Sequence, residues 1–486
     1  MNIQFSNDAK QMKYEVLVRV AGQCYNGELE EKRDEIPYEI IPGNEARYRC
    51  CVYKEREIIR ERVSAAMGKL PRGAENRGAV VSVLPAACEG CPINRYTVTE
   101  NCQRCMARKC VAACPFNAIT VTGKGAYIDP SKCKECGRCA AACPYNAISD
   151  TMRPCLRSCP VDAISIDPSK RAMIKEDRCI GCGACTNDCP FGAITDLSEM
   201  TQVIGLLKQK KNVVAVVAPA IEGQFGNANI AMLVAAIKQL GFADAFEVAL
   251  GADAVAAQEA KEVRAAALAD SHLTTACCSA FVSMIRKHFP KLLPYMSETV
   301  SPMGAVARYI KQQSPGTVVV FIGPCIAKKQ ELENPDNGVD HVLTFEELCA
   351  MFAARGIDPE HFEGDLQEAS LFGKGFAVSG GVAGAVLQAL EEAGQDEPVS
   401  YQKCNGAREC KKALAMLNAG KFDETLLEGM ACENGCVSGP CALVPLKLLQ
   451  KRRDAMLKAA DGRTIGENLR QFDFTGINLK REPDET

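Results

Sequence analysis

Short apolar runs alternate with amphipathic segments through the second half of this chain of 486 residues. The runs at 212–220 and 317–325 are nearly continuous and rich in valine, which is typical of strands buried on both faces. The segments 230–242 and 345–356 repeat apolar residues at helical spacing. Strands that alternate with helices in this way predict α/β layers, with the ends of the strands facing a crevice.

The flanking regions have simpler patterns. Residues 197–212 predict a helix leading into the α/β region, and residues 446–460 predict another before a charged tail. Near the N-terminus, the alternation in Lys13–Gly22 predicts a half-buried strand, and residues 38–55 predict two more strands around a Pro-Gly turn. Lys54–Lys69 is amphipathic and predicts a helix. We therefore expect a small, β-rich N-terminal module.

An internal repeat occupies the region between. Four segments share a Cys-Pro step followed by an Ala-Ile pair, and their cysteines are Cys114, Cys143, Cys159 and Cys189. Such duplication is the mark of paired ferredoxin modules. The expected division is an N-terminal module at 1–85, a duplicated ferredoxin-like domain at 86–196, a large α/β domain at 197–445, and a C-terminal helix and tail at 446–486.

Composition narrows the possible functions. The formal charge of −3 gives no broad basic surface, which argues against nucleic acid and anionic membranes as partners. The longest apolar run, Val213–Ile221, is too short to span a bilayer. The first residues lack the features of a secretion signal, so we expect a cytoplasmic protein. In a reducing compartment, the 28 cysteines point to metal rather than to disulfides.

The cysteine spacing points to iron–sulfur clusters. The pattern C-x2-C-x2-C-x3-C-P places three thiolates on three corners of a [4Fe–4S] cube, and its fourth cysteine ligates the partner cluster in two-cluster ferredoxins. Zinc ribbons compete for any single CxxC pair, but they do not carry the triple spacing with Cys-Pro. Two sets of cysteines have this pattern: Cys133, Cys136, Cys139 and Cys143, and Cys179, Cys182, Cys185 and Cys189. A third set has two extra residues between its second and third ligands: Cys102, Cys105, Cys110 and Cys114.

Sixteen cysteines from Cys88 to Cys189 match the number that four cubes require. We define four groups on this basis. The first is Cys102, Cys105, Cys110 and Cys143; the second is Cys133, Cys136, Cys139 and Cys114; the third is Cys179, Cys182, Cys185 and Cys159; the fourth is Cys88, Cys91, Cys155 and Cys189. The fourth group combines a degenerate repeat with the nearest spare CxxC pair. At least two clusters are expected, and four if all groups form.

Three further motifs lie in the α/β region: TTACCSAFV (274–282), GPCIAKKQE (323–331) and GMACENGC (429–436). They resemble the three signature motifs of the [FeFe] hydrogenases, in order and with the spacings of that family. The replacements Ser279 and Phe281 are similar to those of the group B monomeric enzymes. The resemblance implies a two-lobed α/β domain that holds the H-cluster, a [4Fe–4S] cube joined to a diiron unit with CO, cyanide and azadithiolate.

By that resemblance, Cys278, Cys325 and Cys432 are cube ligands, and Cys436 bridges the cube to the diiron unit. Lys328 resembles the anchor of a cyanide, while Pro219 and Ala220 line the diiron pocket. Thiolates are the ligands that iron–sulfur cubes require, and ligands drawn from distant loops bury the centre between two lobes.

The resemblance also implies a route for protons. Cys277 matches the thiol that passes protons to the bridging amine, and thiols can exchange protons in this way. Protons crossing protein need a chain of titratable, hydrogen-bonding groups. The relay residues implied by motif are Glu259, Glu262, Ser297 and Glu331. Glu259 and Glu262 lie three residues apart, on one helical face.

Several positions depart from the family pattern. Gly323 replaces the usual methionine, Ser279-Ala280-Phe281 replaces Pro-Gly-Trp, and Met303 stands where many relatives have glutamine. These changes leave the ligand cysteines intact and surround the diiron pocket. The chain also has SGGVAG (379–384), which lacks the context of a phosphate loop, and His272, which has no other hydrolase feature beside it.

The leading expectation is therefore an enzyme that interconverts protons, electrons and H2. A small ferredoxin or flavodoxin is the expected electron carrier, because no NAD or flavin module is visible, and maturation proteins are expected to supply the diiron unit. Two alternatives remain. One is an H2 sensor, although sensors generally carry a signalling domain and often lack the proton-transfer thiol. The other is a cluster-carrying assembly protein without the diiron unit, although such relatives lose motif positions that this chain retains.

Overall fold

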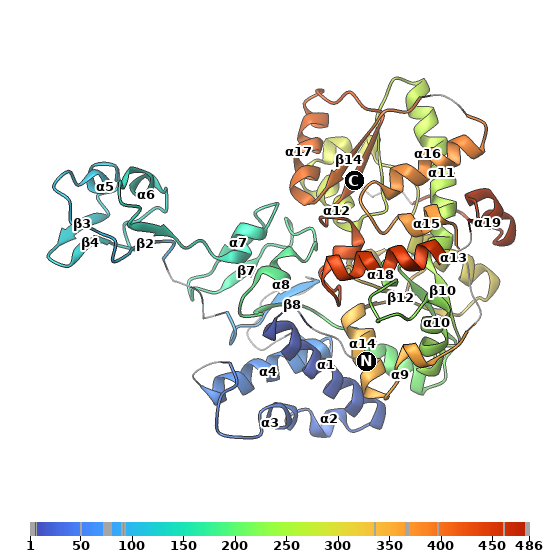
Figure 1. The fold of residues 1–486 in the computed structure, drawn as a ribbon, viewed down its shortest axis with the longest axis horizontal. Helices are drawn as coiled ribbons and strands as arrows, with labels where there is room; N and C mark the ends of the chain where they lie inside the picture. The colour runs from blue at the N-terminus through green and yellow to red at the C-terminus, as the bar shows by residue number, and fades with distance from the viewer. Residues whose placement is uncertain are drawn as a thin grey trace.

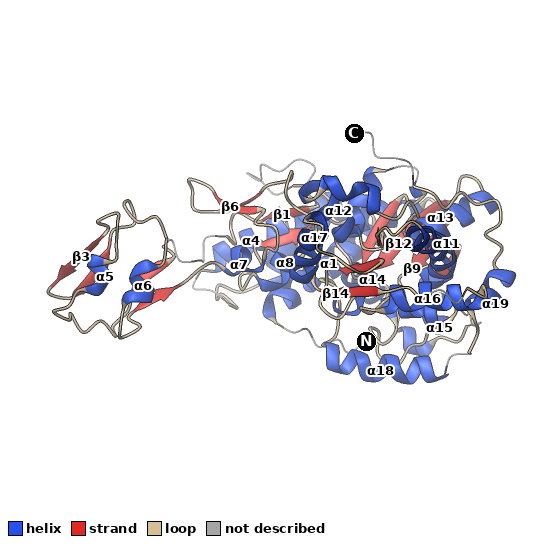
Figure 2. Cartoon of the chain, turned by 90° about the horizontal axis from the view of Figure 1, so that it is seen from above, coloured by secondary structure: helices blue, strands red, loops and turns tan. Residues whose placement is uncertain are grey.

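The computed structural model describes residues 5, 7–48, 51–70, 80–88, 91, 94–334, 337–364, 369–395, 398–459 and 462–481. Figure 1 shows a large two-lobed body with a helical layer below it and a small domain extending to the left. Figure 2, turned by 90°, shows the same small domain standing clear of the body. None of the helices in the described ranges is long and apolar enough to cross a membrane.

Two parallel sheets organise the body. One has the strand order β10-β9-β12-β13 and the other has the order β11-β15-β14. Parallel pairing buries strands on both faces, which accounts for their near-continuous apolar sequences. The strands of the first sheet are β10 (Asp244–Glu247), β9 (Val213–Val217), β12 (Val318–Gly323) and β13 (His341–Thr344); those of the second are β11 (Leu273–Thr274), β15 (Leu426–Met430) and β14 (Tyr401–Asn405).

Helices cover both sheets, as the alternating pattern predicts. The long helix α11 packs against α13, α15 and α16 and so joins the two lobes. The covering helices are α9 (Met200–Lys208), α10 (Ile230–Gln239), α11 (Val248–Leu268), α12 (Ser279–His288), α13 (Pro302–Gln313), α14 (Phe345–Ala354), α15 (Leu371–Gly375), α16 (Gly381–Glu392), α17 (Ala407–Asn418), α18 (Leu446–Ala459) and α19 (Ile465–Gln471). The α/β class and the helices expected at 197–212 and 446–460 are confirmed.

The cysteine repeats build two small α+β domains. The outer domain, residues 94–152, pairs β2 (Tyr96–Val98) with β5 (Ile148–Asp150) and β3 (Ile119–Thr122) with β4 (Gly125–Ile128). The inner domain, built from residues 80–88 and 153–198, pairs β1 (Val81–Val83) with β8 (Ile194–Asp196) and β6 (Ile164–Ile166) with β7 (Ala172–Ile174). A short helix precedes each Cys-Pro step: α5 (Lys109–Ala112), α6 (Arg138–Ala142), α7 (Pro154–Ser158) and α8 (Ala184–Asp188).

The N-terminal module is helical, so its expected β-rich fold is wrong. Lys13–Gly22 lies inside α1 (Asp8–Asn26), which Asn7 caps by accepting the N–H of Lys10. Its buried side chains, among them Met12, Val16 and Val20, repeat every four residues and face α4, α9 and α14. A segment of ten residues can fit both the two-residue period of a strand and the 3.6-residue period of a helix. Packing of the whole helix against its neighbours decides between the two.

The rest of this module follows the same rule. The segment at 38–55 forms α3 (Ile36–Ile40), a loop and the start of α4 instead of two strands, with residues 49 and 50 outside the described part. The helix expected near Lys54–Lys69 is confirmed as α4 (Val52–Ala66), and α2 (Leu29–Lys32) completes the layer. These helices pack onto the inner domain and the first lobe.

Candidate H-cluster and cluster-relay sites

The motif cysteines of the body follow the carboxyl ends of three parallel strands. Cys278 comes after β11, Cys325 comes after β12, and Cys432 comes after β15. Cys436 begins the short helix η6 (Cys436–Ser438) one turn later. Carboxyl ends of parallel strands from two sheets face the crevice between the lobes, which is where α/β proteins place their sites.

The structure brings these four half-buried thiols together at the crevice. Burial raises the pKa of Cys325 to about 11, and the neighbouring Cys278 thiol adds to the rise. Burial likewise raises the pKa of Cys436, and the Cys325 and Cys278 thiols add to the rise. The pKa of Cys432 rises through burial and through Cys325 and Cys436.

A [4Fe–4S] cube fits this donor set. Buried thiols that raise one another's pKa become thiolates when a cation binds them, and soft sulfur ligands select iron–sulfur clusters. Across the described ranges, no three His, Cys, Asp or Glu side chains gather closely enough to chelate one metal ion. A cube takes each sulfur on a different iron atom, so its ligands stand farther apart than those of a single ion.

A glycine makes the tight spacing of the last motif possible. Gly435, between Cys432 and Cys436, has φ of 85°, a left-handed conformation that suits glycine. A Cβ there would meet the carbonyl oxygen of Ala377 at 2.7 Å. The backbone of Gly435 thus lies directly against the segment 377–379, and both cysteines turn toward the crevice.

Lys328 and Cys277 lie beside the four thiols. The Lys328 ammonium is buried, donates to the carbonyl oxygen of Cys277 at 3.2 Å, and pairs with Glu331 Oε1 at 2.6 Å. Although burial opposes its charge, the Glu331 carboxylate raises the pKa of Lys328. Lys328 is therefore a fixed cation at the edge of the thiol site. Pro219 and Ala220 form the helix η1 (Pro219–Ile221) at the end of β9, on the same crevice.

A second set of groups leads away from Cys277. Glu259 is fully buried in α11 and accepts the N–H of Ala276 at 3.2 Å. Burial raises the pKa of Glu259 to about 7, Glu262 adds to the rise, and a hydrogen bond from Ser297 opposes it. Thr299 extends the set, because its N–H donates to Ser297 Oγ and its hydroxyl donates to Glu262 at 2.7 Å.

Glu331 belongs to a different set. Besides Lys328, its carboxylate accepts hydrogen bonds from the hydroxyls of Ser279 and Ser301 and from the amide of Asn337. Despite its burial, the Lys328 ammonium lowers the pKa of Glu331. Glu331 lies at the wall of a cavity of about 200 Å³, which Arg286, Arg308 and Arg481 also line.

The cysteines of the ferredoxin region gather by group. Burial raises the pKa of Cys110, with Cys143 and Cys105 as neighbouring thiols, and it raises the pKa of Cys139, with Cys133 and Cys114 nearby. Burial raises the pKa of Cys185 beside three thiols of the third group, Cys182, Cys179 and Cys159. It raises the pKa of Cys155 to about 11 beside the rest of the fourth group, Cys189, Cys88 and Cys91.

The repeated sequence makes a repeated contact. In each Cys-Pro-x-x-Ala segment the alanine N–H points at the sulfur four residues earlier, at 3.2 to 3.4 Å. Hydrogen bonds of this kind stabilise the negative charge of a ligand sulfur and help set the potential of its cluster. The four sulfurs are those of Cys114, Cys143, Cys159 and Cys189.

The groups follow one another toward the crevice. The thiol of Cys182, in the third group, neighbours Cys278 and Cys432 of the body, and the fourth-group Cys155 neighbours Cys185. Lysines of α12 and α17 hold the inner domain against the body. Lys287 donates to the carbonyl oxygen of Cys179 at 2.8 Å, and Lys411 donates to that of Pro160 at 2.9 Å. The outer domain holds the other two groups.

Comparisons with known proteins identify these parts. Residues 211–440 match the family "Iron only hydrogenase large subunit, C-terminal domain". Before this region, residues 101–147 match a 4Fe-4S dicluster domain and residues 149–200 match the LdpA Fe-S cluster-binding domain. The expected ferredoxin-type domains and the [FeFe] hydrogenase resemblance are therefore confirmed.

Individual relatives agree over this region. The chain is 26% identical over 285 residues to iron hydrogenase 1 of Clostridium pasteurianum, covering 47% of this chain and 50% of that protein. It is 29% identical over 290 residues to the periplasmic [Fe] hydrogenase large subunit of Nitratidesulfovibrio vulgaris, covering 47% of this chain and 68% of the relative. The chain thus spans about half the length of the Clostridium relative.

Solved structures match the hydrogenase fold. The [FeFe]-hydrogenase HydA(ΔEFG), described in connection with stepwise H-cluster assembly, has a TM-score of 0.50 and 23% identity. The match covers 58% of this chain and 96% of that structure. This likeness confirms the two-lobed α/β fold of the body.

Two contributors to the site lie outside the sequence motifs. Thr299 has no motif of its own, and only its position two residues after Ser297 suggested it. Arg481 comes from the C-terminal tail and donates to the carbonyl oxygens of Ala276 and Thr299 at 3.3 and 3.4 Å. Cys441, five residues after Cys436, is buried next to Lys13, Asp196 and Glu346.

Proposed function

We propose that this protein is an [FeFe] hydrogenase, which interconverts two protons and two electrons with H2. The observation that carries the proposal is the convergence of four half-buried thiols, Cys278, Cys325, Cys432 and Cys436, at the carboxyl ends of strands from two sheets. Beside them lie a thiol with no place in the ligand set, Cys277, and a buried cation, Lys328. The H-cluster would supply the redox chemistry of H2 at this position.

The chain's own groups would hold the cofactor and move protons. Three thiols would hold the cube, Cys436 would join it to the diiron unit, and Lys328 would donate to a cyanide. Cys277 Sγ would carry the proton nearest the reacting centre. Glu259 would exchange protons with it, since a carboxyl with pKa near 7 gives and takes protons at neutral pH with little cost. Ser297, Glu262 and Thr299 would continue the chain of hydrogen bonds outward.

The thiol groups of the ferredoxin domains would carry the electrons. Cys182 of the third group neighbours the thiols that would hold the body cube, and Cys155 of the fourth group neighbours the third. The outer domain would receive electrons from a carrier. No disulfide joins any of the described cysteines, and for a chain with 28 cysteines this supports a reducing cytoplasm as the compartment.

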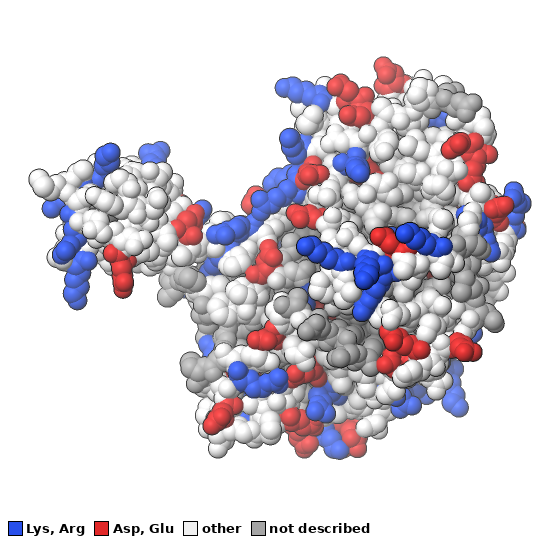
Figure 3. Space-filling model, in the orientation of Figure 1, with Lys and Arg blue, Asp and Glu red and all other residues white. Residues whose placement is uncertain are grey.

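Charge on the outer domain supports an acidic carrier such as a small ferredoxin or flavodoxin. Residues 94–152 carry eight Lys and Arg against four Asp and Glu, in a chain whose total is negative. Blue side chains surround much of this left-hand domain in Figure 3. Arg104, Lys109 and Lys124 are exposed near the first group, and Met106 between its ligands is 98% exposed. Basic rims with an apolar centre suit transient docking.

Infrared spectroscopy of the matured protein tests the function. Bands in the CO and cyanide region together with H2 evolution from a reduced dye would establish the enzyme. Bands with very slow turnover would favour an H2 sensor, and iron without bands would favour an assembly protein. Protein made without maturation proteins should show neither bands nor turnover.

The docking surface has its own test. The triple change Arg104→Glu, Lys109→Glu and Lys124→Glu should slow reduction by an acidic ferredoxin about tenfold at low salt and less at high salt. Turnover with a small dye should stay the same. The matched control reverses three exposed lysines of α18, Lys447, Lys451 and Lys458. Equal effects of the two triple variants would contradict docking at the outer domain.

A further inference from the structure

Helix α4 of the N-terminal module presents two adjacent buried charges to the inner ferredoxin domain. Glu61 is 6% exposed and Arg62 is 5% exposed, although both side chains belong to a helix near the surface. Charged side chains are seldom buried so fully unless they have a specific partner. Their partners lie in two segments that are far apart in sequence.

Glu61 holds the segment that leads to Cys88. Both of its carboxylate oxygens accept the N–H of Ala86, at 3.2 and 3.0 Å. Ala86 lies two residues before Cys88 and three residues after the end of β1. A carboxylate that takes a backbone N–H with both oxygens fixes the position of that peptide, because charge-assisted hydrogen bonds are short and strong.

Arg62 holds the segment that carries Cys189. Its Nη2 donates to the carbonyl oxygen of Gly192 at 2.7 Å. Gly192 has φ of 55°, and a Cβ there would meet the Arg62 guanidinium at 2.4 Å. The N–H of Gly192 donates to the carbonyl oxygen of Cys189, and the next residue, Ala193, donates to its sulfur at 3.2 Å. The cation thus fits the turn that presents the Cys189 thiol.

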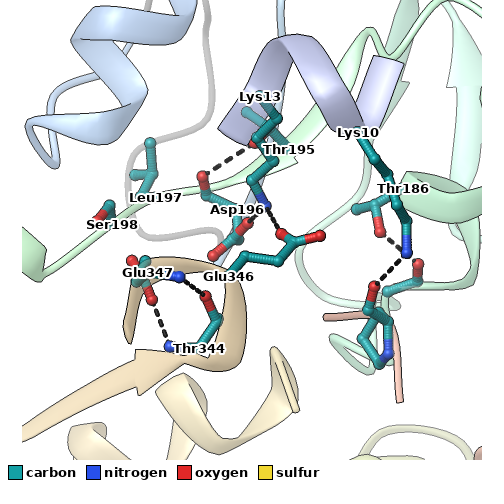
Figure 4. Close-up of polar contacts among 12 residues, drawn as sticks. Lys10, Lys13, Thr186, Thr195, Asp196, Leu197, Ser198, Thr344, Glu346 and Glu347 are labelled. Atoms are coloured by element: carbon teal, nitrogen blue, oxygen red, sulfur yellow. Dashed lines mark hydrogen bonds and ion pairs between the residues drawn. The ribbon is translucent and has the colours of Figure 1, made fainter. Parts of the chain in front are cut away.

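The two segments are neighbours in the fold. Leu84 donates to the carbonyl oxygen of Ala193 at 2.7 Å, and β1 pairs with β8 just beyond. Helix α1 also joins the N-terminal module to both neighbours, because Lys13 pairs with Asp196 at the end of β8 and with Glu346 of α14 (Figure 4). The N-terminal module therefore spans the inner domain and the hydrogenase domain.

The charge of Arg62 also suits a cluster. Burial lowers the pKa of Arg62 to about 10, while the Cys189 thiol and the Glu346 carboxylate oppose that decrease. A [4Fe–4S] cube on four thiolates is an anion, and a nearby buried cation compensates its charge.

We propose that α4 is the scaffold of the fourth cluster, with Glu61 and Arg62 as positioning residues that hold Cys88 and Cys189 in register for Cys91 and Cys155. This proposal rests on the cysteine grouping within the proposed function, and it gives the N-terminal module a role. The four ligands come from three separate segments, so this group lacks the short loop with three cysteines that each of the other three groups has. In this group, helix α4 would position the ligands as that loop does in the other groups.

Iron counting on the full chain tests the proposal. Cubes are reconstituted in the purified protein, and iron and acid-labile sulfide are measured for Arg62→Met and Glu61→Gln. Each variant should lose about four iron atoms per chain, the content of one cube. The matched control is Arg60→Met on the same helix, whose side chain is 37% exposed and pairs with Glu57. It should keep the full content.

Two further measurements identify the cluster that is lost. Reductive titration followed by electron paramagnetic resonance should show one signal missing in Arg62→Met and Glu61→Gln, and restored in Arg62→Lys, which keeps the cation. Dye-linked turnover should persist, since the hydrogenase domain is intact. Full iron content in both variants would overturn the proposal, as would loss from the other groups. Absence of H-cluster bands in the parent protein would refute the proposed function and leave the iron count valid.

Discussion

The Glu259 carboxylate accepts the backbone N–H of Ala276 at 3.2 Å, so it lies directly behind the motif cysteine Cys277. Its raised pKa of about 7 places a proton-exchanging group at this position at neutral pH. Carboxyls on a solvated helix face would keep pKa values near 4.5. Burial of α11 between the two lobes causes the difference.

Removing the Glu259 carboxyl should block proton delivery. Glu259→Gln should lower H2 evolution about 100-fold or more, because general acid–base groups contribute 10²–10⁴-fold. In the parent protein, evolution should fall as the pH rises through about 7, when Glu259 loses its proton. Infrared bands should persist in the variant. Lys261→Gln, exposed on the same helix, serves as the control, and an equal loss there would contradict the relay.

The thiol of Cys277 should be needed for turnover and not for cofactor binding. Cys277→Ala should reduce turnover by about two to four orders of magnitude, since it breaks the proton chain at its inner end. Cofactor bands and iron content should stay close to those of the parent. Unchanged turnover would refute the proton route, and loss of iron would make Cys277 a ligand instead.

The buried pair of Asp196 and Lys329 should matter for stability. Asp196 contacts Lys329 and Lys13 at 2.7 Å each, and Lys329 and Asp196 are buried. Asp196→Asn should lower the free energy of unfolding by about 3 kcal/mol, because it leaves buried ammonium groups with less compensation. Denaturant titration followed by circular dichroism measures this. Glu28→Gln, which breaks the exposed pair with Lys32, should change stability by less than about 0.5 kcal/mol.

Asp253 should make stability depend on pH. Burial raises its pKa to about 6, although the hydroxyl of Ser370 and the amide of Asn468 donate to it. A carboxyl whose pKa is higher in the folded state stabilises the fold below its unfolded pKa and loses that effect as the pH rises toward 6. From pH 5 to pH 7, the free energy of unfolding should fall by roughly 1–1.5 kcal/mol relative to Asp253→Asn. Parallel curves for the two proteins would contradict this.

Some of the architecture could be predicted because its causes are local. Three thiols on a CxxCxxC loop lie within one turn of chain, so their spacing alone indicates a cube. Valine-rich runs such as 213–217 and 318–323 form parallel strands because burial on both faces demands apolar residues throughout. The repeated Ala-Ile pairs pack the small domains, and the alanine N–H contacts to sulfur follow from the same repeat.

Other features could not be predicted because their causes are distant in sequence. Lys13–Gly22 has an alternation that suits a strand, yet packing against α4, α9 and α14 makes it part of a helix. Glu331 shares a motif with Lys328, and the structure places it with Ser279 and Ser301, apart from Glu259 and Ser297. No local pattern marks which carboxylates share a hydrogen-bonded set, since that depends on which helices meet.

The sequence by itself predicted the chemistry of this protein: a cysteine spacing that indicates iron–sulfur clusters, and motifs within the region that matches the iron-only hydrogenase family. Short-range geometry carries that information, because ligand spacing and strand patterning act over a few residues. Only the tertiary structure decided which charged side chains are buried and which groups they pair with. The tertiary structure buries Glu259 and so raises its pKa, and it places Lys329 beside Asp196. It also brings Glu61 and Arg62 to the segments of Cys88 and Cys189. Each of these effects depends on contact between distant parts of the chain.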